Sequence, residues 1–383
     1  MRMDFSEIAG QVHLKAHLLK TIENGRIPHA QLFVGNAGSG LLPMAIAYAR
    51  ELLCSEANTA EKKELCAKKI DKLAHPDLHF VYPVNTSSVA KKNAISVHYT
   101  EEWRKFVQTN PYASLFEWLQ SLGIEKKQGN ISKFEAEDIA KRLSLKSYEG
   151  GSKVLIMWMA DKMNTECANK ILKLVEEPPK KTILLLLTEH EEQIITTIRS
   201  RCQTLNFPLL SEENISTTLV KNHNIKESIA RTISRQSNGD LNKALQFISN
   251  EGDDLQFEKW FIDWVRTAFK AKGNKKAIND LLQWSETLAS QGRETQKKFL
   301  SYCMETFRQA LLKNYKADSL LFFYAVDEKF SIEKFAPFIH QNNIFEIDTA
   351  LQDASYHIER NGNGKLIFTD LSIQLTRLIH KPE

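Results

Sequence analysis

Two apolar runs separated by one helical segment constrain the fold most tightly. They cover residues 153–159 and 182–187, and apart from the first residue of each run every side chain is apolar. Strands of a parallel sheet that is covered by helices on both faces have this composition. Residues 165–175 between the runs have helical periodicity and end before Pro178 and Pro179, which stop a helix. This order of strand, helix and strand predicts an α/β domain with a mostly parallel sheet.

A third expected strand, at 31–34, leads into a glycine-rich turn at 35–40 and an apolar-periodic helix at 42–54. This is the arrangement of a phosphate-binding loop, in which glycines let backbone N–H groups approach a phosphate. Such a loop also needs a Lys for the β- and γ-phosphates and a Ser or Thr for Mg²⁺. Leu41 and Leu42 stand at those two positions. The loop glycines are Gly35, Gly38 and Gly40. A glycine-rich turn also occurs between a strand and a helix for structural reasons alone.

The end of the 153–159 strand is the second place where nucleotide chemistry is expected. An active site of this kind puts an Asp there for Mg²⁺ and then a Glu for the attacking water. Trp158 and Met159 stand at these positions. Asp161 falls beyond the strand, so we expect it to be solvated or to cap a helix. The sequence therefore predicts no nucleotide cofactor.

The chain changes character after Pro208 and becomes helical. Residues 212–250 are expected to form a small helical unit, with Asp240 as a helix cap. Long amphipathic helices follow from about residue 253, and one apolar stripe is formed by Phe257, Trp260, Phe261, Trp264 and Ala268. We predict an α/β domain at 1–207, a helical domain at 208–250 and a helical bundle at 253–383.

Residues 77–150 are less regular than the rest of the first domain. Residues 85–93 are rich in Ser, Thr and Lys and are expected to form an exposed loop, whereas 99–122 and 133–143 look helical. No motif in 77–130 indicates any chemistry.

The composition is that of an ordinary globular protein, with 42% hydrophobic and 26% charged residues. A formal charge of +4 is too small for a protein whose whole surface binds nucleic acid, but it does not exclude a local basic stripe.

Asp4 and Glu7 stand where a signal peptide needs an apolar run, and no apolar run is long enough to span a membrane. Five scattered cysteines fit reduced thiols better than a disulfide framework, so a cytoplasmic location is expected.

Several short segments, taken in order, resemble those of the bacterial DNA polymerase III clamp-loader family, over nearly the whole chain. They lie at 27–30, 75–77, 168–179 and 198–202. The resemblance implies a P-loop NTPase-like AAA+ domain at 1–207, a helical lid at 208–250 and an all-α collar at 253–383.

In this family a Ser-Arg-Cys motif supplies an arginine finger to the ATP site of the neighbouring subunit, and Ser200, Arg201 and Cys202 match it. The planar guanidinium fits the γ-phosphate and the charge that develops on it in the transition state. An Arg at this place can also pair with a carboxylate or cap a helix. Thr188 remains where the family senses phosphate, and Asn242 stands at the position of a sensor arginine.

The resemblance thus implies a family member whose own ATP site is degenerate and which has no catalytic activity when isolated. Its implied partners are the gamma/tau and delta subunits of a hetero-pentamer, the sliding clamp, and primer–template DNA. One alternative is a divergent loader subunit that keeps nucleotide binding or ATPase activity. Another is a helical interaction protein without a role in replication.

The family usually carries a four-cysteine zinc module before the 75–77 segment. Only Cys54 and Cys66 lie in that region here, with His75 as a candidate third ligand, so we expect no metal. Lys170 and Lys173 are candidate contacts to DNA phosphates, and a solvated Lys pair on a helix face is the alternative.

Overall fold

The computed structural model describes residues 2–249, 254–317, 321 and 330–382. The chain divides into two compact units. Unit 1 comprises residues Met1–Ile124 and Gln128–Ile248, and unit 2 comprises Glu125–Lys127 and Ser249–Glu383. The predicted boundary between the second and third domains, at 250–253, lies outside the described residues.

Unit 1 contains a five-stranded, entirely parallel sheet in the order β2-β3-β4-β1-β5. The strands are β1 (Ala30–Gly35), β2 (Leu78–Val81), β3 (Lys153–Met157), β4 (Thr182–Thr188) and β5 (Gln203–Phe207). The strands that the sequence predicts are all present, and β3 ends two residues earlier than expected. The α/β class with a parallel sheet is therefore confirmed.

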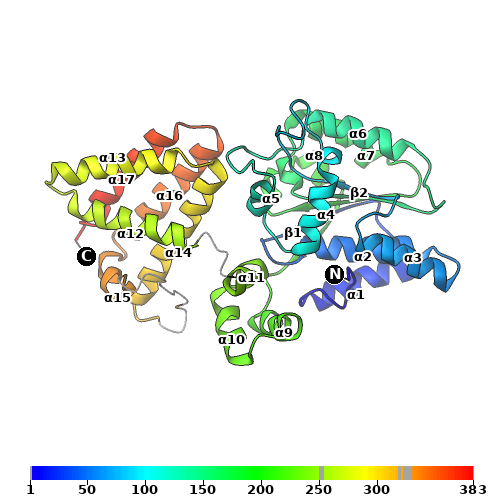
Figure 1. The fold of residues 1–383 in the computed structure, drawn as a ribbon, viewed down its shortest axis with the longest axis horizontal. Helices are drawn as coiled ribbons and strands as arrows, with labels where there is room; N and C mark the ends of the chain where they lie inside the picture. Colours follow the sequence, from blue (N-terminus) through cyan, green and yellow to red (C-terminus); the bar gives the residue numbers. More distant parts are fainter. Residues whose placement is uncertain (1, 250–253, 318–320, 322–329, 383) are drawn as a thin grey trace. The chain divides into compact units, whose positions relative to one another are not determined.

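Alternate residues of the central strands enter two separate cores, as a sheet covered on both faces requires. Phe33, Ile156 and Leu185 pack into one core with helices α1 (Val12–Glu23), α2 (Leu41–Ser55) and α3 (Ala60–Asp71). Their sequence neighbours pack into a second core with α6 (Lys133–Ser144), α7 (Thr165–Glu176) and α8 (Thr196–Arg199); these neighbours are Leu32, Leu155 and Leu184. Figure 1 shows the sheet between these two sets of helices.

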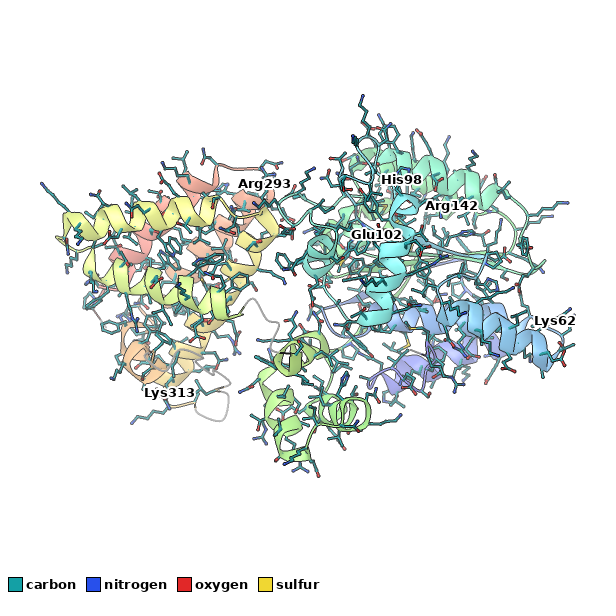
Figure 2. All side chains as sticks on the ribbon, viewed as in Figure 1. Lys62, His98, Glu102, Arg142, Arg293 and Lys313 are labelled. Atoms are coloured by element: carbon teal, nitrogen blue, oxygen red, sulfur yellow. A yellow bond between two sulfur atoms is a disulfide. The ribbon has the colours of Figure 1, made fainter. Side chains whose placement is uncertain are left out.

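The segment expected to be helical at 99–122 is two helices, α4 (Thr100–Thr109) and α5 (Leu115–Ser121), with a turn at 110–114. Pro111 and the Ser114 cap explain the break, since Ser114 Oγ accepts a hydrogen bond from the backbone N–H of Glu117 and begins a new helix. In Figure 2, Glu102 marks the first turn of α4 and Arg142 the last turn of α6.

Helices α9 (Glu212–His223), α10 (Glu227–Gln236) and α11 (Leu241–Ser249) follow β5 and have a small core of their own. We call these three helices the lid. Its core includes Leu210, Ile215, Leu219, Ala230, Leu241 and Ala244, together with Ala9 and Tyr112. Asp240 Oδ1 accepts a hydrogen bond from Lys243 N at 3.1 Å, so the predicted helix cap is confirmed.

Unit 2 is helical where it is described. Its helices are α12 (Asp254–Lys270), α13 (Lys275–Ala289), α14 (Arg293–Asn314), α15 (Ile332–Phe335), α16 (Ile344–Glu359) and α17 (Gly364–Leu378). The predicted aromatic stripe of α12 lies in its core, where Trp264 is fully buried and stacks on Trp284. No helix in the described part of the chain is both long and apolar enough to cross a membrane.

Candidate functional site

The glycine-rich turn has the backbone of a phosphate loop, but its two key side chains point into the core. Gly38 and Gly40 have positive φ angles of 70° and 96°, which favour glycine. Leu41 and Leu42, at the positions for the phosphate Lys and the Mg²⁺ hydroxyl, are 8% and 3% exposed. Both leucines belong to the core cluster beside the sheet. The loop therefore offers neither a cation nor a metal ligand at these positions.

The lid lies directly against this loop. Leu241 N donates to Gly38 O at 3.4 Å. A Cβ on Gly38 would lie 1.8 Å from Asp240 Oδ1, so only glycine fits here. Burial raises the pKa of Asp240 to about 6, although hydrogen bonds from backbone N–H groups lower it in part. In its ionised form this carboxyl would repel a phosphate at the loop.

Gln11 joins the loop to the start of the lid. Its Nε2 donates to Ser39 O at 3.1 Å and to Pro208 O at 2.8 Å. Ser39 and Gln11 are both buried. The loop backbone is therefore tied to Pro208, which precedes the first lid helix.

Trp158 and Met159, at the positions of the expected acidic pair, are also buried. Trp158 joins a cluster of aromatic rings, with its ring centroid 5.2 Å from that of Trp103 and 6.2 Å from that of Phe106. Met159 has a φ of 55° and follows the end of β3. An indole in an aromatic cluster cannot bind Mg²⁺ or polarise water, so this half of a nucleotide site is also replaced by core packing.

The expectation that Asp161 is solvated or caps a helix is wrong. Its side chain is buried, accepts a hydrogen bond from Thr188 Oγ1 at 2.9 Å, and pairs with Lys162 Nζ at 2.8 Å. Thr188 also accepts a hydrogen bond from His190 N at 3.0 Å. The Thr188 hydroxyl, at the position expected from the resemblance to sense phosphate, is thus engaged as donor and acceptor within the chain.

Arg201, in contrast, is exposed at the surface just after α8. Its Nη2 lies 2.8 Å from Glu176 Oε1, and its Nη1 donates to Thr197 O at 2.9 Å. Ser200 Oγ donates to Thr197 O at 3.2 Å. Cys202 packs against the core on the α7 side of the sheet, and burial raises the pKa of its thiol to about 11. Arg201 thus lies between a hydrogen-bonded Ser200 and a core-packed Cys202, and its own side chain is partly exposed.

Lys170 and Lys173 lie on the exposed side of α7. Lys170 Nζ pairs with Glu137 Oε1 of α6. Lys173 has no acidic partner in the described part of the chain. The two side chains share a helix face, but only Lys170 is engaged by a carboxylate.

The expectation of reduced thiols is wrong for two of the five cysteines. Cys54, in the last turn of α2, forms a disulfide with Cys66 of α3. The two helices pack against each other and bring cysteines 12 positions apart in the sequence within bonding distance. His75 does not join them, since its Nδ1 accepts from Asp77 N at 3.2 Å and its Nε2 faces Glu149 Oε2 at 3.3 Å. Among the described residues, no group of three or more His, Cys, Asp or Glu side chains could hold a metal ion.

Glu117 is a residue of the site region that sequence reasoning missed. It lies in the first turn of α5, and its carboxylate accepts hydrogen bonds from Asn242 and Gln246 of the lid. The Ser-x-x-Glu spacing at 114–117 signals a capping box, which predicts the helix start but not the lid contact.

The parallel sheet, the phosphate-loop turn and the following helices define an AAA+-type α/β protein, in which buried leucines stand at the expected positions of the phosphate Lys and the Mg²⁺ hydroxyl. The family model described as DNA polymerase III, delta subunit, matches residues 10–211, which is more than half of the chain. The chain therefore belongs to this family, and the clamp-loader resemblance is confirmed.

Curated relatives agree with this family. The chain is 29% identical over 223 residues to DNA polymerase III subunit delta′ of Bacillus subtilis, which covers 58% of this chain and 54% of that protein. It is 22% identical over 228 residues to subunit delta′ of Haemophilus influenzae, covering 57% and 56%. It is 25% identical over 217 residues to subunit gamma/tau of Mycobacterium tuberculosis, covering 57% and 31%. The chain thus spans about half the length of the delta′ relatives and less of gamma/tau.

Two solved structures that are similar to the chain come from Thermotoga maritima. The RuvB Holliday junction branch migration motor has a TM-score of 0.40 and 12% identity, with 82% of this chain and 80% of that chain covered. A DNA polymerase III gamma subunit-related protein has a TM-score of 0.35 and 14% identity, with 95% and 99% covered.

Proposed function

We propose that this chain acts as the delta prime subunit of a bacterial clamp loader, as a stator that binds no ATP and supplies Arg201 to the ATP site of a neighbouring gamma/tau subunit. The proposal rests on one contrast within unit 1. The positions that would bind phosphate and Mg²⁺ are occupied by buried Leu41 and Leu42, whereas Arg201 remains at the surface.

The chemistry of Arg201 supports a role in trans. Its side chain is 41% exposed, and among the described residues its guanidinium is held by one surface carboxylate and one backbone carbonyl. Both contacts can be exchanged for the γ-phosphate of a nucleotide on another subunit, which carries more negative charge than one carboxylate. Stabilisation of the charge that develops on the transferring phosphoryl group is what an arginine finger contributes.

The remaining parts of the proposal follow from the family. In it, the chain has three domains, at 1–207, 208–250 and 253–383, and the last is the collar of a hetero-pentamer with gamma/tau and delta subunits. That assembly places the sliding clamp on primer–template DNA. Lys173 would contact DNA phosphates inside this assembly. Lys170 would do the same once its ion pair with Glu137 is broken.

Titration calorimetry with Mg-ATP tests the nucleotide-free role. We expect no binding heat with the isolated chain, and a stable, ATP-hydrolysing complex after mixing with its own gamma/tau and delta subunits. Saturable ATP binding by the isolated chain would contradict the proposal and favour a divergent subunit that keeps its own nucleotide site.

A further inference from the structure

Side chains of segment 110–117 form hydrogen bonds with the lid. No sequence motif in this segment indicates a function. Asn242 Nδ2 of α11 donates to Glu117 Oε2 at 2.6 Å, and Gln246 Nε2 donates to Glu117 Oε1 at 3.0 Å. Asn110 Nδ2 in turn donates to Asn242 Oδ1 at 2.6 Å. We call these four side chains the lid latch.

Glu117 is the acceptor at the centre of the latch. Besides the two lid amides, it accepts hydrogen bonds from Ser114 N at 2.7 Å and Ser114 Oγ at 2.6 Å. Burial raises the pKa of Glu117, but these hydrogen bonds outweigh burial and hold the pKa below its ordinary value. The donors are all neutral, and within the described ranges no Lys, Arg or His forms an ion pair with Glu117. The negative charge is therefore stabilised by hydrogen bonds, two of which come from the lid.

The same segment contributes to the lid core. Tyr112 is 7% exposed and packs in the cluster of lid side chains. Its hydroxyl accepts a hydrogen bond from Ala9 N at 3.0 Å. Segment 110–117 thus joins the lid both by the apolar packing of Tyr112 and by the hydrogen bonds of the latch.

We infer that Glu117 is an internal anion that keeps the lid closed on the degenerate loop without any nucleotide. The clamp-loader resemblance aligns Asn242 with a sensor arginine, and in this chain the partner of Asn242 is the carboxylate of Glu117. A lid held through a nucleotide opens when the nucleotide leaves, whereas a lid held by Glu117 has no such dependence. This inference concerns unit 1 alone and stands whether or not Arg201 acts as a finger.

Hydrogen exchange of the full chain, with and without Asn242→Asp, tests this inference. The substitution keeps the shape of the side chain, removes the N–H donor and places a second carboxylate against Glu117. We expect amides of α9, α10 and α11 to exchange roughly tenfold faster or more, because a hydrogen bond to a charged group is lost, while β1 and β4 keep their protection. Asn222→Asp is the matched control, since Asn222 is exposed on α9 and its change adds the same charge away from the latch.

Gln246→Ala serves as a milder second variant, because it removes one donor from a half-buried position. It should accelerate exchange in the lid less than Asn242→Asp does, again without an effect on the sheet. This variant decides the question if Asn242→Asp destabilises the whole chain. Lid exchange in Gln246→Ala equal to that of the native chain would overturn the inference. A clear gain of lid protection when Mg-ATP is added to the native chain would overturn it as well.

Discussion

Glu176 holds the guanidinium of Arg201 on its own chain, with Glu176 Oε1 2.8 Å from Arg201 Nη2. Glu176 is the last residue of α7, and Arg201 follows α8, so the pair links two elements of unit 1. Both side chains are about two-fifths exposed, at 41% and 42%. Ion pairs at such exposure contribute about 0–1 kcal/mol. Arg201 can therefore leave Glu176 for a phosphate at a small cost in free energy.

Glu176→Gln should release Arg201 without harming the fold. We expect the unfolding free energy of the isolated chain to change by about 0.5 kcal/mol or less, and ATP turnover by the assembled loader to rise by up to about fivefold, which corresponds to about 1 kcal/mol. Steady-state ATP hydrolysis measures the second effect. Glu177→Gln, at the exposed neighbouring residue, is the control. A fall in turnover with Glu176→Gln would mean that Glu176 positions Arg201 for the reaction instead of restraining it.

Restoring a polar side chain to the phosphate loop should not restore nucleotide binding. Leu42→Thr places a hydroxyl at the Mg²⁺ position, but Leu42 is 3% exposed and packs in the core. We expect a loss of about 2–4 kcal/mol in unfolding free energy, from lost apolar contacts and a buried hydroxyl, and no heat of Mg-ATP binding. Leu65→Thr, at a 55% exposed site on α3, should be nearly neutral. ATP binding by the Leu42→Thr chain would show that the loop is open to nucleotide.

The Cys54–Cys66 disulfide should stabilise unit 1 measurably. A crosslink that closes a loop of this length contributes about 2–3 kcal/mol, mainly by restricting the unfolded chain. Denaturant unfolding should therefore show the native chain losing this amount when a reductant is added. The Cys54→Ala/Cys66→Ala chain should be insensitive to the reductant, because Cys167, Cys202 and Cys303 are free thiols. Equal stability of the oxidised and reduced native chain would refute a stabilising crosslink.

Glu135 should make the protein less stable as the pH rises through neutrality. Burial raises the pKa of Glu135 from 4.5 to about 7, although Ser96 N donates to its Oε2 at 2.7 Å. The folded chain therefore binds this proton more tightly than the unfolded chain does. The stability that the protonated group contributes is complete below about pH 4.5 and is lost as the pH rises through about 7.

Glu135→Gln removes this titration and keeps an acceptor for Ser96. Relative to the native chain, the unfolding free energy of the variant should rise as the pH increases from 4.5 to 7, and the difference should reach roughly 3 kcal/mol at pH 8. Urea unfolding at several pH values measures this difference. Glu137→Gln, at an exposed residue of the same helix, should show no such gain. A stability difference that does not vary with pH would contradict the assigned cause.

The parallel sheet could be predicted from the sequence because its strands are buried on both faces. Apolar runs such as 182–187 have no other stable place in a chain of this composition. The degenerate loop could be predicted for a similar reason, since Leu41 and Leu42 replace the side chains that phosphate and Mg²⁺ require. These features are local, and each is visible within a few residues.

Features that depend on distant pairs could not be predicted. Glu117 and Asn242 are 125 positions apart, and nothing near either residue indicates the other. Cys54 and Cys66 pair because two helices pack together, which their spacing alone does not reveal. Asp161 is buried against Thr188 because β4 lies next to β3, so its exposure depends on the order of the strands.

The most direct test of the account is ATP turnover by the loader reconstituted with Arg201→Ala in this chain. Arg199→Ala is the control, since Arg199 is an exposed residue of the same segment. Arg199 Nη1 lies 4.0 Å from Glu191 Oε1. An arginine finger contributes roughly 10³-fold or more at the site it serves, so the turnover that depends on that site should vanish in a complex that still assembles. Arg201→Lys should not restore it, because a lysine lacks the planar fork. Unchanged turnover with Arg201→Ala in a fully assembled complex would contradict the central claim.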